Sequence, residues 1–484
     1  MYYGNLTNQK VFSYKINWFF VIVLEIFWAI LCVVLPYYLI IPFFVYFTVL
    51  ILILIRPKWG IYPLIFLVPI ISNYIGFYSE ASSIIKKLFR FNNYIDYMPF
   101  YMLISLPAFF SLILSELTGF KSYFVRSKIN LLFLILFFWN FLLLICSPNI
   151  IYSTVPFLTF TINILLYYLL VFAIDEEGFH RKLMWCCIFV GLIMSSVVCI
   201  SFFFEFKFEE KIVLWEGLSF SANVRNHIRG RGQCLGHPNE TSLILNLLTC
   251  VSIGMVLCEK NKIKKLICKT SLIFFIFANF LTMSKSGTLA FLAMIHFLLF
   301  SIHSLRKKLF WNLILLNSTW IFLFFLGIKF ISETKAPRLF AGGSNAAFSI
   351  TSRLDMWKEG ISNLLNNSLG FGLGPGGFRY YTHTGMPSPH SFYVSVLCDL
   401  GFVGLLILFL VILIIVKNYL QMFRHQDTYS QVMFICCCGG LLAIGVQGLI
   451  DSSYISSFNW LFLGLSVSAF HLARKGLVHL KEDS

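Results

Sequence analysis

The sequence predicts an all-α membrane protein whose chain crosses the bilayer many times. Of its 484 residues, 58% are hydrophobic and 12% are charged, and the mean hydropathy is +0.82. Apolar runs of about 20 residues recur along the chain, the length that a helix needs to cross roughly 30 Å of hydrocarbon. We expect a polytopic helical bundle of about 12–14 transmembrane helices with a large polar loop that contains short amphipathic helices. A membrane β-barrel is excluded, because it would show alternating segments of about ten residues.

Fourteen apolar segments are candidate spans, and this even number would place both termini in the cytoplasm. They are residues 16–35, 36–55, 60–78, 98–117, 129–147, 150–174, 183–204, 238–258, 268–283, 288–302, 310–330, 391–416, 432–450 and 457–473. Residues 81–92, with Lys86, Lys87 and Arg90, would then lie outside. They form an interfacial amphipathic helix, or they mark a miscounted span.

The basic residues orient the spans. The net charge is +16, yet most Lys and Arg residues lie in short loops between spans, as expected of cytoplasmic loops under the positive-inside rule. These residues are Arg56 and Lys58; Lys121, Arg126 and Lys128; Arg181 and Lys182; Lys260, Lys262, Lys264, Lys265 and Lys269; Arg306, Lys307 and Lys308; Lys417 and Arg424; Arg474 and Lys475. This pattern indicates membrane orientation and no nucleic-acid partner.

Three polar clusters fall on the opposite, non-cytoplasmic side. The first contains Arg225, Arg229 and Arg231, shortly before a span that starts near Pro238, where Asn239 can cap the exposed N–H groups. Planar guanidinium groups suit diphosphate oxygens, and the N-terminus of the following helix adds partial positive charge. Contact with lipid headgroups is the alternative.

The second cluster is a tight turn between two spans with Lys285 at its tip, flanked by Ser284 and Ser286. Gly287 allows close packing behind it. The turn would suit a phosphate or a sugar hydroxyl. A solvated loop lysine is the alternative interpretation.

The third cluster begins at Arg353. Trp357, Ile361 and Leu364 or Leu365 follow at helical spacing, and Arg353 and Lys358 lie off that stripe. We therefore expect a short amphipathic helix on the membrane surface.

A glycine-rich turn over residues 370–377 follows this helix, with Arg379 just beyond it. Its glycines, among them Gly374 and Gly376, permit positive φ and can bring backbone N–H groups close to a ligand. A flexible turn is the alternative.

His390 stands where the next long span begins. An imidazole can accept a proton from a hydroxyl near neutral pH, while clustered arginines hold a phosphorylated leaving group. The clusters together indicate group transfer from a lipid diphosphate to an alcohol. The two large outer loops contain only one cysteine, Cys234, so we expect neither a disulfide framework nor a thiolate metal site.

The order of these motifs resembles the O-antigen ligase and polymerase superfamily, which comprises WaaL-type and Wzy-type membrane glycosyltransferases. The resemblance rests on residues 232–240, on SKSG at 284–287, on Arg353 with Trp357, on LGFGLGPGGF, and on HSFYVSVLCDLGFVGL from His390. It covers roughly residues 220–416.

The resemblance implies inverting-type transfer of an undecaprenyl-diphosphate-linked oligosaccharide to an acceptor sugar, with no cofactor. The acceptor would be another glycan, for a repeat-unit polymerase, or lipid A core, for an O-antigen ligase. We favour the polymerase, because the chain has more spans than a minimal ligase. The enzyme would lie in the bacterial inner membrane with its active site facing the periplasm, and chain-length regulator and flippase proteins are further expected partners.

Residue roles follow from the same resemblance. His390 would be the general base, and Arg353 with one of the three arginines of the first cluster would bind the diphosphate. The other expected substrate-binding residues are Arg225, Arg229, Arg231, Asn239, Lys285, Gly374, Gly376 and Arg379. Two positions depart from the family pattern: Lys285 stands where Arg is common, and Ser391 where Asn is common.

The chain divides by this reasoning into N-terminal transmembrane helices (1–204), a catalytic core (205–416, with the periplasmic loop 331–390) and C-terminal transmembrane helices (417–484). The rival class is a transporter of lipid-linked glycans, which would use ionisable residues near the midplane. Glu25, His296 and Asp399 are the candidates for it. Asp451 faces outward in this topology and is either a structural turn residue or an assistant to the site.

Overall fold

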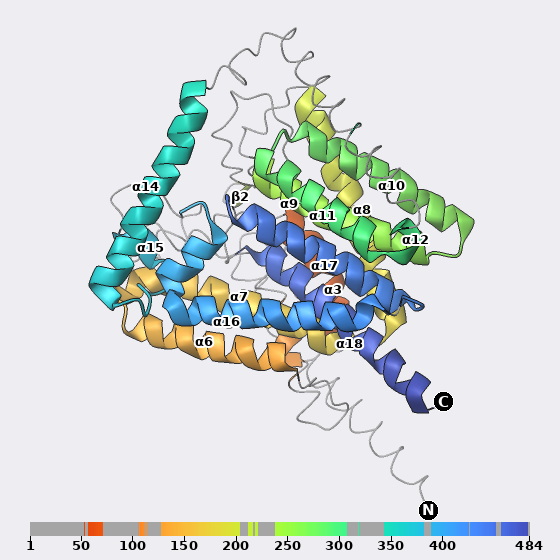
Figure 1. Ribbon diagram of the computed structural model, residues 1–484, viewed down its shortest axis with the longest axis horizontal. Coiled ribbons are helices and arrows are strands. Elements are labelled where there is room, and N and C mark those ends of the chain that lie inside the picture. The colour runs from red at the N-terminus through yellow and green to blue at the C-terminus, as the bar shows by residue number, and fades with distance from the viewer. Residues whose placement is uncertain are drawn as a thin grey trace, which may run out of the picture.

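The computed structural model describes residues 57–70, 127–203, 212–215, 218–220, 238–306, 343–381, 389–424, 426–451 and 456–482, with isolated positions at 53, 105, 107–111, 113 and 318. In these ranges the protein is a bundle of long helices (Figure 1). The helices are η1 (Pro57–Gly60), α3 (Ile61–Ile70), α6 (Lys128–Ile145), α7 (Ile150–Ala173), α8 (Glu177–Phe203), α9 (Pro238–Cys258), α10 (Lys262–Leu281), α11 (Lys285–Ser301), α12 (His303–Arg306), α14 (Gly343–Ser368), α15 (Gly377–Tyr381), α16 (Phe392–Phe423), α17 (Tyr429–Gly448) and α18 (Ser457–Glu482).

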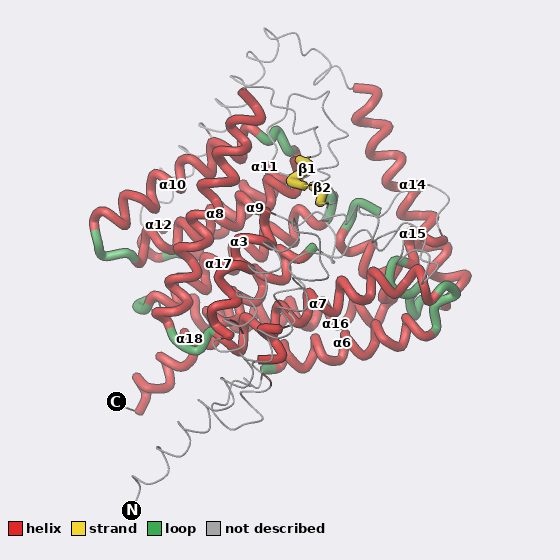
Figure 2. Tube along the Cα trace, turned by 180° about the vertical axis from the view of Figure 1, so that it is seen from behind, coloured by secondary structure: helices red, strands yellow, loops and turns green. Residues whose placement is uncertain are grey.

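The strands of the described part of the chain are short. β1 (Ile212–Trp215) and β2 (Leu218–Phe220), which follow α8 and precede α9 along the chain, pair antiparallel and are drawn in yellow in Figure 2. They leave the fold all-α and polytopic, as predicted.

Six described helices are long and apolar enough to cross a membrane, and α11 is a shorter apolar helix. They are α6, α7 from Ser153, α8, α9, α16 and α17, which coincide with six of the expected spans. The expected spans 268–283 and 457–473 are the helices α10 and α18. The expected spans 16–35, 36–55, 98–117 and 310–330, and the helix at 81–92, lie outside the described residues apart from isolated positions. The total of 12–14 spans therefore stays a prediction.

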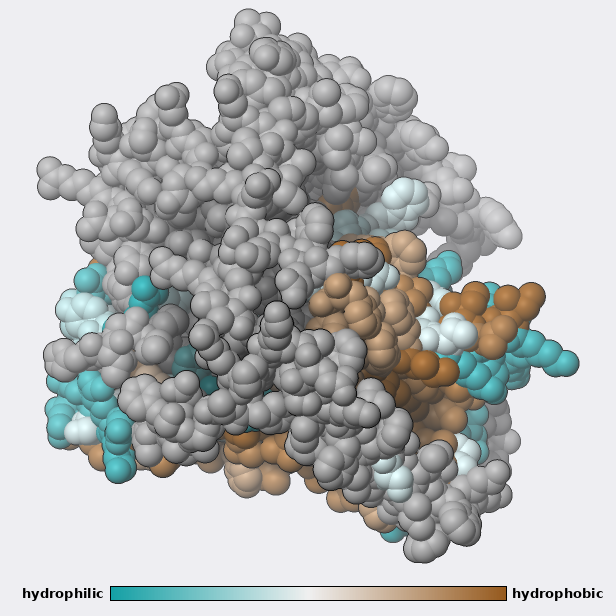
Figure 3. All heavy atoms as spheres, turned by 90° about the horizontal axis from the view of Figure 1, so that it is seen from above, coloured by the Kyte–Doolittle hydropathy of each residue, from teal (hydrophilic) through white to brown (hydrophobic). Residues whose placement is uncertain are grey.

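The two ends of the helix bundle differ in composition, and one of them carries the basic residues. α6 and α10 begin, and α16 and α18 end, with the Lys and Arg residues of the predicted cytoplasmic loops, and these ends lie toward the right in Figure 1. We call this the basic end and the opposite one the His390 end. In Figure 3 hydrophobic residues show in the middle of the described surface, and hydrophilic ones gather toward the two ends. This arrangement fits a bundle that crosses an apolar layer.

A buried polar network fixes three helices just beneath the His390 end. Ser242 of α9 donates to the Asn279 side chain of α10, whose Nδ2 donates to Asn246 Oδ1 over 2.7 Å. Asn246 in turn donates to the Gly287 carbonyl of α11 over 3.0 Å. Gly287 packs directly on Ser242, where a Cβ would lie 1.8 Å from the hydroxyl oxygen. The close packing expected at Gly287 is confirmed, and it holds the first turns of α9 and α11 together.

α14 stands across the His390 end (Figure 1). Its inner face buries Met356 and Leu364 against Phe378 and Cys398. Leu354, Ile361, Leu365 and Leu369 form an exposed apolar stripe on another face. The helix is amphipathic, as predicted, and of the two leucines left open for the stripe it is Leu365 that shares the exposed face with Ile361, whereas Leu364 is buried.

Candidate functional site

Asp451, just after α17, joins two of the predicted site residues. Its Oδ1 lies 3.6 Å from His390 Nδ1, an ion-pair distance, and its Oδ2 accepts a hydrogen bond from Asn239 Nδ2. The side chain of Asp451 is 17% exposed and that of His390 is 37% exposed. The histidine is thus open to a ligand on one side and has a carboxylate on the other.

Asn239 connects this pair to the turn before α11. Its Oδ1 accepts from Ser284 Oγ over 2.7 Å, and its carbonyl accepts from Gln447 Nε2 over 2.7 Å. The expectation that Asn239 caps α9 was wrong: the helix begins at Pro238, so Asn239 lies within the first turn and its side chain points at Asp451 and Ser284. Asn239 therefore positions the site.

The backbone around His390 is held on both sides. His390 has φ 51°, in the left-handed region that non-glycine residues seldom occupy. Trp357 Nε1 donates to the carbonyl of Pro389 over 2.7 Å. Ser391 caps α16 by accepting from Val394 N, and its hydroxyl lies 3.3 Å from the Gly448 carbonyl to which it donates. Strain of this kind persists where the surroundings determine it, and here α14 and α17 do so.

Arg353 of α14 reaches the same place. Its Nη1 donates to the carbonyl of Ile450 over 2.7 Å, so the guanidinium lies next to the residue that precedes Asp451. This bond uses one of five guanidinium donors in a fixed planar group. The structure therefore brings Arg353 and His390 to one site, as the sequence predicted.

Three helices, α9, α11 and α16, begin at this site. Each helix N-terminus carries a partial positive charge and outward-pointing N–H groups, which attract anions. Lys285 is the first residue of α11 and is exposed, with Ser284 as the N-cap. The helix starts three residues before the expected span, so Lys285 lies on a helix turn at the site.

The glycine-rich turn is folded around Asp399 of α16. Asp399 Oδ1 accepts from Phe378 N over 2.9 Å and Oδ2 from Gly376 N over 3.3 Å, while its carbonyl accepts from Gly374 N over 3.1 Å. Gly374 and Gly376 have positive φ, as predicted, of 90° and 70°. The expectation that their N–H groups face a ligand was wrong, because these groups bond to Asp399. Arg379 is exposed on α15, beyond the turn.

The remaining expectations divide into two groups. Arg225, Arg229 and Arg231 lie outside the described residues. Asp399 and His296, the transporter candidates, are engaged within the fold: Asp399 by the glycine turn, and His296 Nδ1 at 2.7 Å from the carbonyl of Leu292 in its own helix. Among the described residues no group of three or more His, Cys, Asp or Glu could hold a metal ion.

Asp451 is the site residue that sequence reasoning undervalued. Its only signal was its place on the predicted outer side, 61 residues after His390, and nothing local marks it as the partner of a histidine. The contact arises because α17 packs against α9 and α11, which brings its last turn beside Asn239.

The fold and site thus define a polytopic membrane protein with a histidine, a carboxylate and an arginine where three helices begin. Residues 270–409 match the family model described as O-antigen ligase, which supports the resemblance to the O-antigen ligase and polymerase superfamily. A search of the curated proteins finds no match. The matched segment includes Lys285, Arg353 and His390, whereas Asn239 and Asp451 lie outside it. The family supports a membrane enzyme that transfers glycans.

Proposed function

We propose that the protein transfers an undecaprenyl-diphosphate-linked oligosaccharide to an acceptor sugar, as a repeat-unit polymerase of a surface polysaccharide. The pair of His390 and Asp451 beside Arg353, where three helices begin, carries this proposal. The site would face the periplasm of the bacterial inner membrane, because it lies opposite the basic end of the helices.

We infer a step for each of these residues. His390 takes the proton of the acceptor hydroxyl while Asp451 stabilises the imidazolium that forms. The acceptor oxygen bonds to the anomeric carbon as its bond to the diphosphate breaks. Arg353, Lys285 and the helix N-termini hold the departing undecaprenyl diphosphate, whose negative charge increases in the transition state. Attack opposite the leaving group inverts the anomeric configuration.

The second candidate is ligation to lipid A core, which the description of the matching family favours. It uses the same donor and the same chemistry, and differs in the acceptor. A transporter is less consistent with the described residues, since Asp399 and His296 are bonded within the fold and leave the polar chemistry at the His390 end. Glu25 lies outside the described residues.

The test is complementation of a strain in which this gene is deleted. Wild type, His390→Ala and His303→Ala would be expressed to equal levels, and surface glycan and the lipid-linked pool compared by gel and by extraction. His303 is an exposed histidine at the basic end, so His303→Ala is the matched control and should behave as wild type. We expect His390→Ala to abolish transfer.

The products distinguish the two candidates. Single repeats attached to lipid A core without long chains would indicate a polymerase. Long chains accumulating on undecaprenyl diphosphate with none on the core would indicate a ligase. Unchanged glycan in the deletion strain would refute both candidates.

A further inference from the structure

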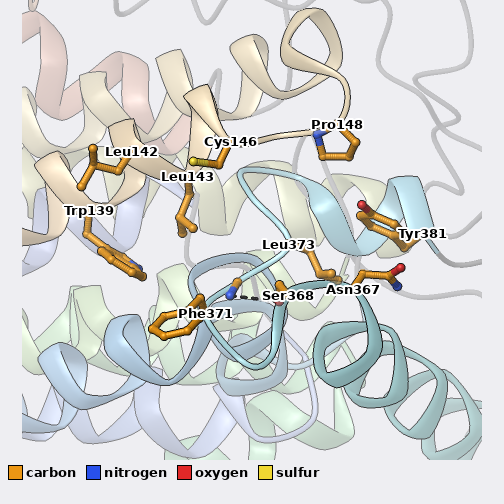
Figure 4. A pocket seen from close by; sticks show the side chains of 11 residues that line it. Trp139, Leu142, Leu143, Cys146, Pro148, Asn367, Ser368, Phe371, Leu373 and Tyr381 are labelled. Atoms are coloured by element: carbon orange, nitrogen blue, oxygen red, sulfur yellow. Dashed lines mark hydrogen bonds between the residues drawn. The ribbon is translucent and has the colours of Figure 1, made fainter.

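A pocket of about 470 Å³ lies at the His390 end, between the last turns of α6 and the junction of α14 with the glycine turn (Figure 4). This volume is within the range of about 300–1,000 Å³ typical of ligand sites. Trp139, Leu142 and Leu143 line it from α6, and Phe371 and Leu373 from the glycine turn. The Trp139 and Phe371 rings lie with centroids 6.4 Å apart.

Three hydrogen-bond donors of the lining are used within the protein. Trp139 Nε1 donates to the Leu400 carbonyl over 2.8 Å, and Asn367 Nδ2 donates to the Asn363 carbonyl over 2.9 Å. Ser368 Oγ donates to the Leu364 carbonyl over 2.8 Å. A sugar or a phosphate would find few donors here, whereas a hydrocarbon chain would need none.

The pocket has a polar rim. In Figure 4 Asn367 and Tyr381 lie at one side, near Pro148, and Trp139 and Phe371 at the other. Burial, with a smaller contribution from Tyr380, raises the pKa of Tyr381, so its hydroxyl stays neutral at physiological pH. An apolar interior with a neutral polar rim suits the chain of a lipid and the start of its headgroup.

The pocket also adjoins apolar surface. Leu142 on α6 is 53% exposed and Phe371 is 57% exposed. Trp139 lies six residues before the last residue of α6, about 9 Å along the helix, so the pocket is near the end of the span. A lipid in that leaflet could enter sideways from the bilayer.

We propose that this pocket holds the lipid anchor of the acceptor, through the part of its hydrocarbon chain nearest the headgroup. Arg353 and Ser368 are fifteen residues apart on α14, about 22 Å along the helix axis. The donor diphosphate at Arg353 is joined directly to its lipid, so its first carbons cannot lie that far away. An acceptor carries several sugars between its lipid and its reacting hydroxyl, and this separation suits it.

The acceptor assignment rests on the proposed function, whereas binding of a hydrocarbon chain does not. Because bilayer chains are as apolar as the pocket, moving a hydrocarbon chain from the bilayer into the pocket gains little free energy. The pocket therefore positions the anchor rather than extracting it. The same chemistry could be supplied by an ordinary phospholipid, so the experiment must separate these two sources.

Cys146→Trp fills the pocket, and Ile145→Trp is its matched control. Cys146 is an exposed pocket residue at the end of α6, and the neighbouring Ile145 is 56% exposed outside the pocket. In a transfer assay we expect Cys146→Trp to raise KM for the lipid-anchored acceptor about tenfold with kcat and the donor KM unchanged. A water-soluble acceptor glycan without its lipid should react equally with all three proteins. An unchanged KM for the anchored acceptor would refute the proposal.

A second measurement needs no activity. Wild-type protein in nanodiscs would be irradiated with a phospholipid that carries a diazirine near its headgroup, and adducts mapped. We expect adducts in residues 139–148 or 367–373 that Cys146→Trp loses and Ile145→Trp keeps. Displacement by anchored acceptor supports the acceptor assignment, whereas adducts that it does not displace show a phospholipid site and overturn it. No adducts would overturn chain binding. If wild-type protein shows no transfer but the anchored acceptor still displaces the phospholipid adducts, the proposed function is wrong and lipid binding in the pocket stands.

Discussion

Asp451→Asn tests whether the carboxylate acts on His390 through its charge. The substitution is nearly isosteric, and the new amide oxygen can still accept the hydrogen bond from Asn239 Nδ2. It removes the negative charge that lies 3.6 Å from His390 Nδ1. Folding should therefore survive, and the histidine should lose the group that stabilises its protonated form.

The size of the effect follows from the distance and the exposure. Two unit charges 3.6 Å apart attract by about 5 kcal/mol at an effective dielectric constant of about 20. Fully exposed pairs contribute only about 0.2–1 kcal/mol. With His390 37% and Asp451 17% exposed, we expect about 1–3 kcal/mol, or roughly a 5- to 150-fold fall in kcat.

The assay is transfer from purified lipid-linked donor by protein in nanodiscs. Because the imidazolium forms only as the proton is transferred, kcat should fall while the donor KM stays the same. Asp451→Glu keeps the charge and should be intermediate. Asp427→Asn removes an exposed carboxylate at the basic end and should match wild type. Wild-type kcat in Asp451→Asn would show that the pairing has no catalytic role.

Two further predictions concern the proposed diphosphate site and the packing of the glycine turn on Gly401. Arg353→Lys keeps the charge but loses the planar group, so the donor KM should rise about tenfold, about 1.4 kcal/mol, in the nanodisc assay; a wild-type KM would remove Arg353 from the diphosphate site. Gly401→Ala should destabilise the protein by about 3 kcal/mol or more, because Gly401 has φ 70° and a Cβ there would lie 2.3 Å from the Phe371 backbone. Thermal unfolding in detergent would show this, with Gly178→Ala, which meets no atom within 4 Å, as the control.

The spans were predictable because lipid imposes strong rules. A backbone in hydrocarbon must satisfy its own hydrogen bonds, so long apolar runs become helices, and the described ones coincide with expected spans. That Arg353 and His390 lie at the same site could also be predicted, since both were expected to lie on one side of the membrane. Sidedness narrows the position of a residue to a face of the molecule, but not to a contact.

The contacts between residues at the His390 end depend on how the helices pack, and the sequence alone does not show this packing. The glycine spacing predicted positive φ. The acceptor for the N–H groups of the turn, however, is Asp399, which lies over twenty residues later along the chain. The role of Asn239 depended on the residue at which α9 begins, and a sequence pattern does not fix that residue. Because α9 begins at Pro238, Asn239 is not its cap, and the side chain instead donates a hydrogen bond to Asp451.

The site includes residues on both sides of the ends of the matching segment. His390 and Arg353 lie within residues 270–409, whereas Asn239 and Asp451 lie on either side of that segment. The buried network of Ser242, Asn246 and Asn279 fixes α9 to α10 and α11, and the bond from Gln447 of α17 to the Asn239 carbonyl fixes the start of α9 next to Asp451. A change that shifts α9 would therefore move Asn239 relative to Asp451, and so weaken the hydrogen bond that positions the carboxylate, without altering any residue of the matching segment.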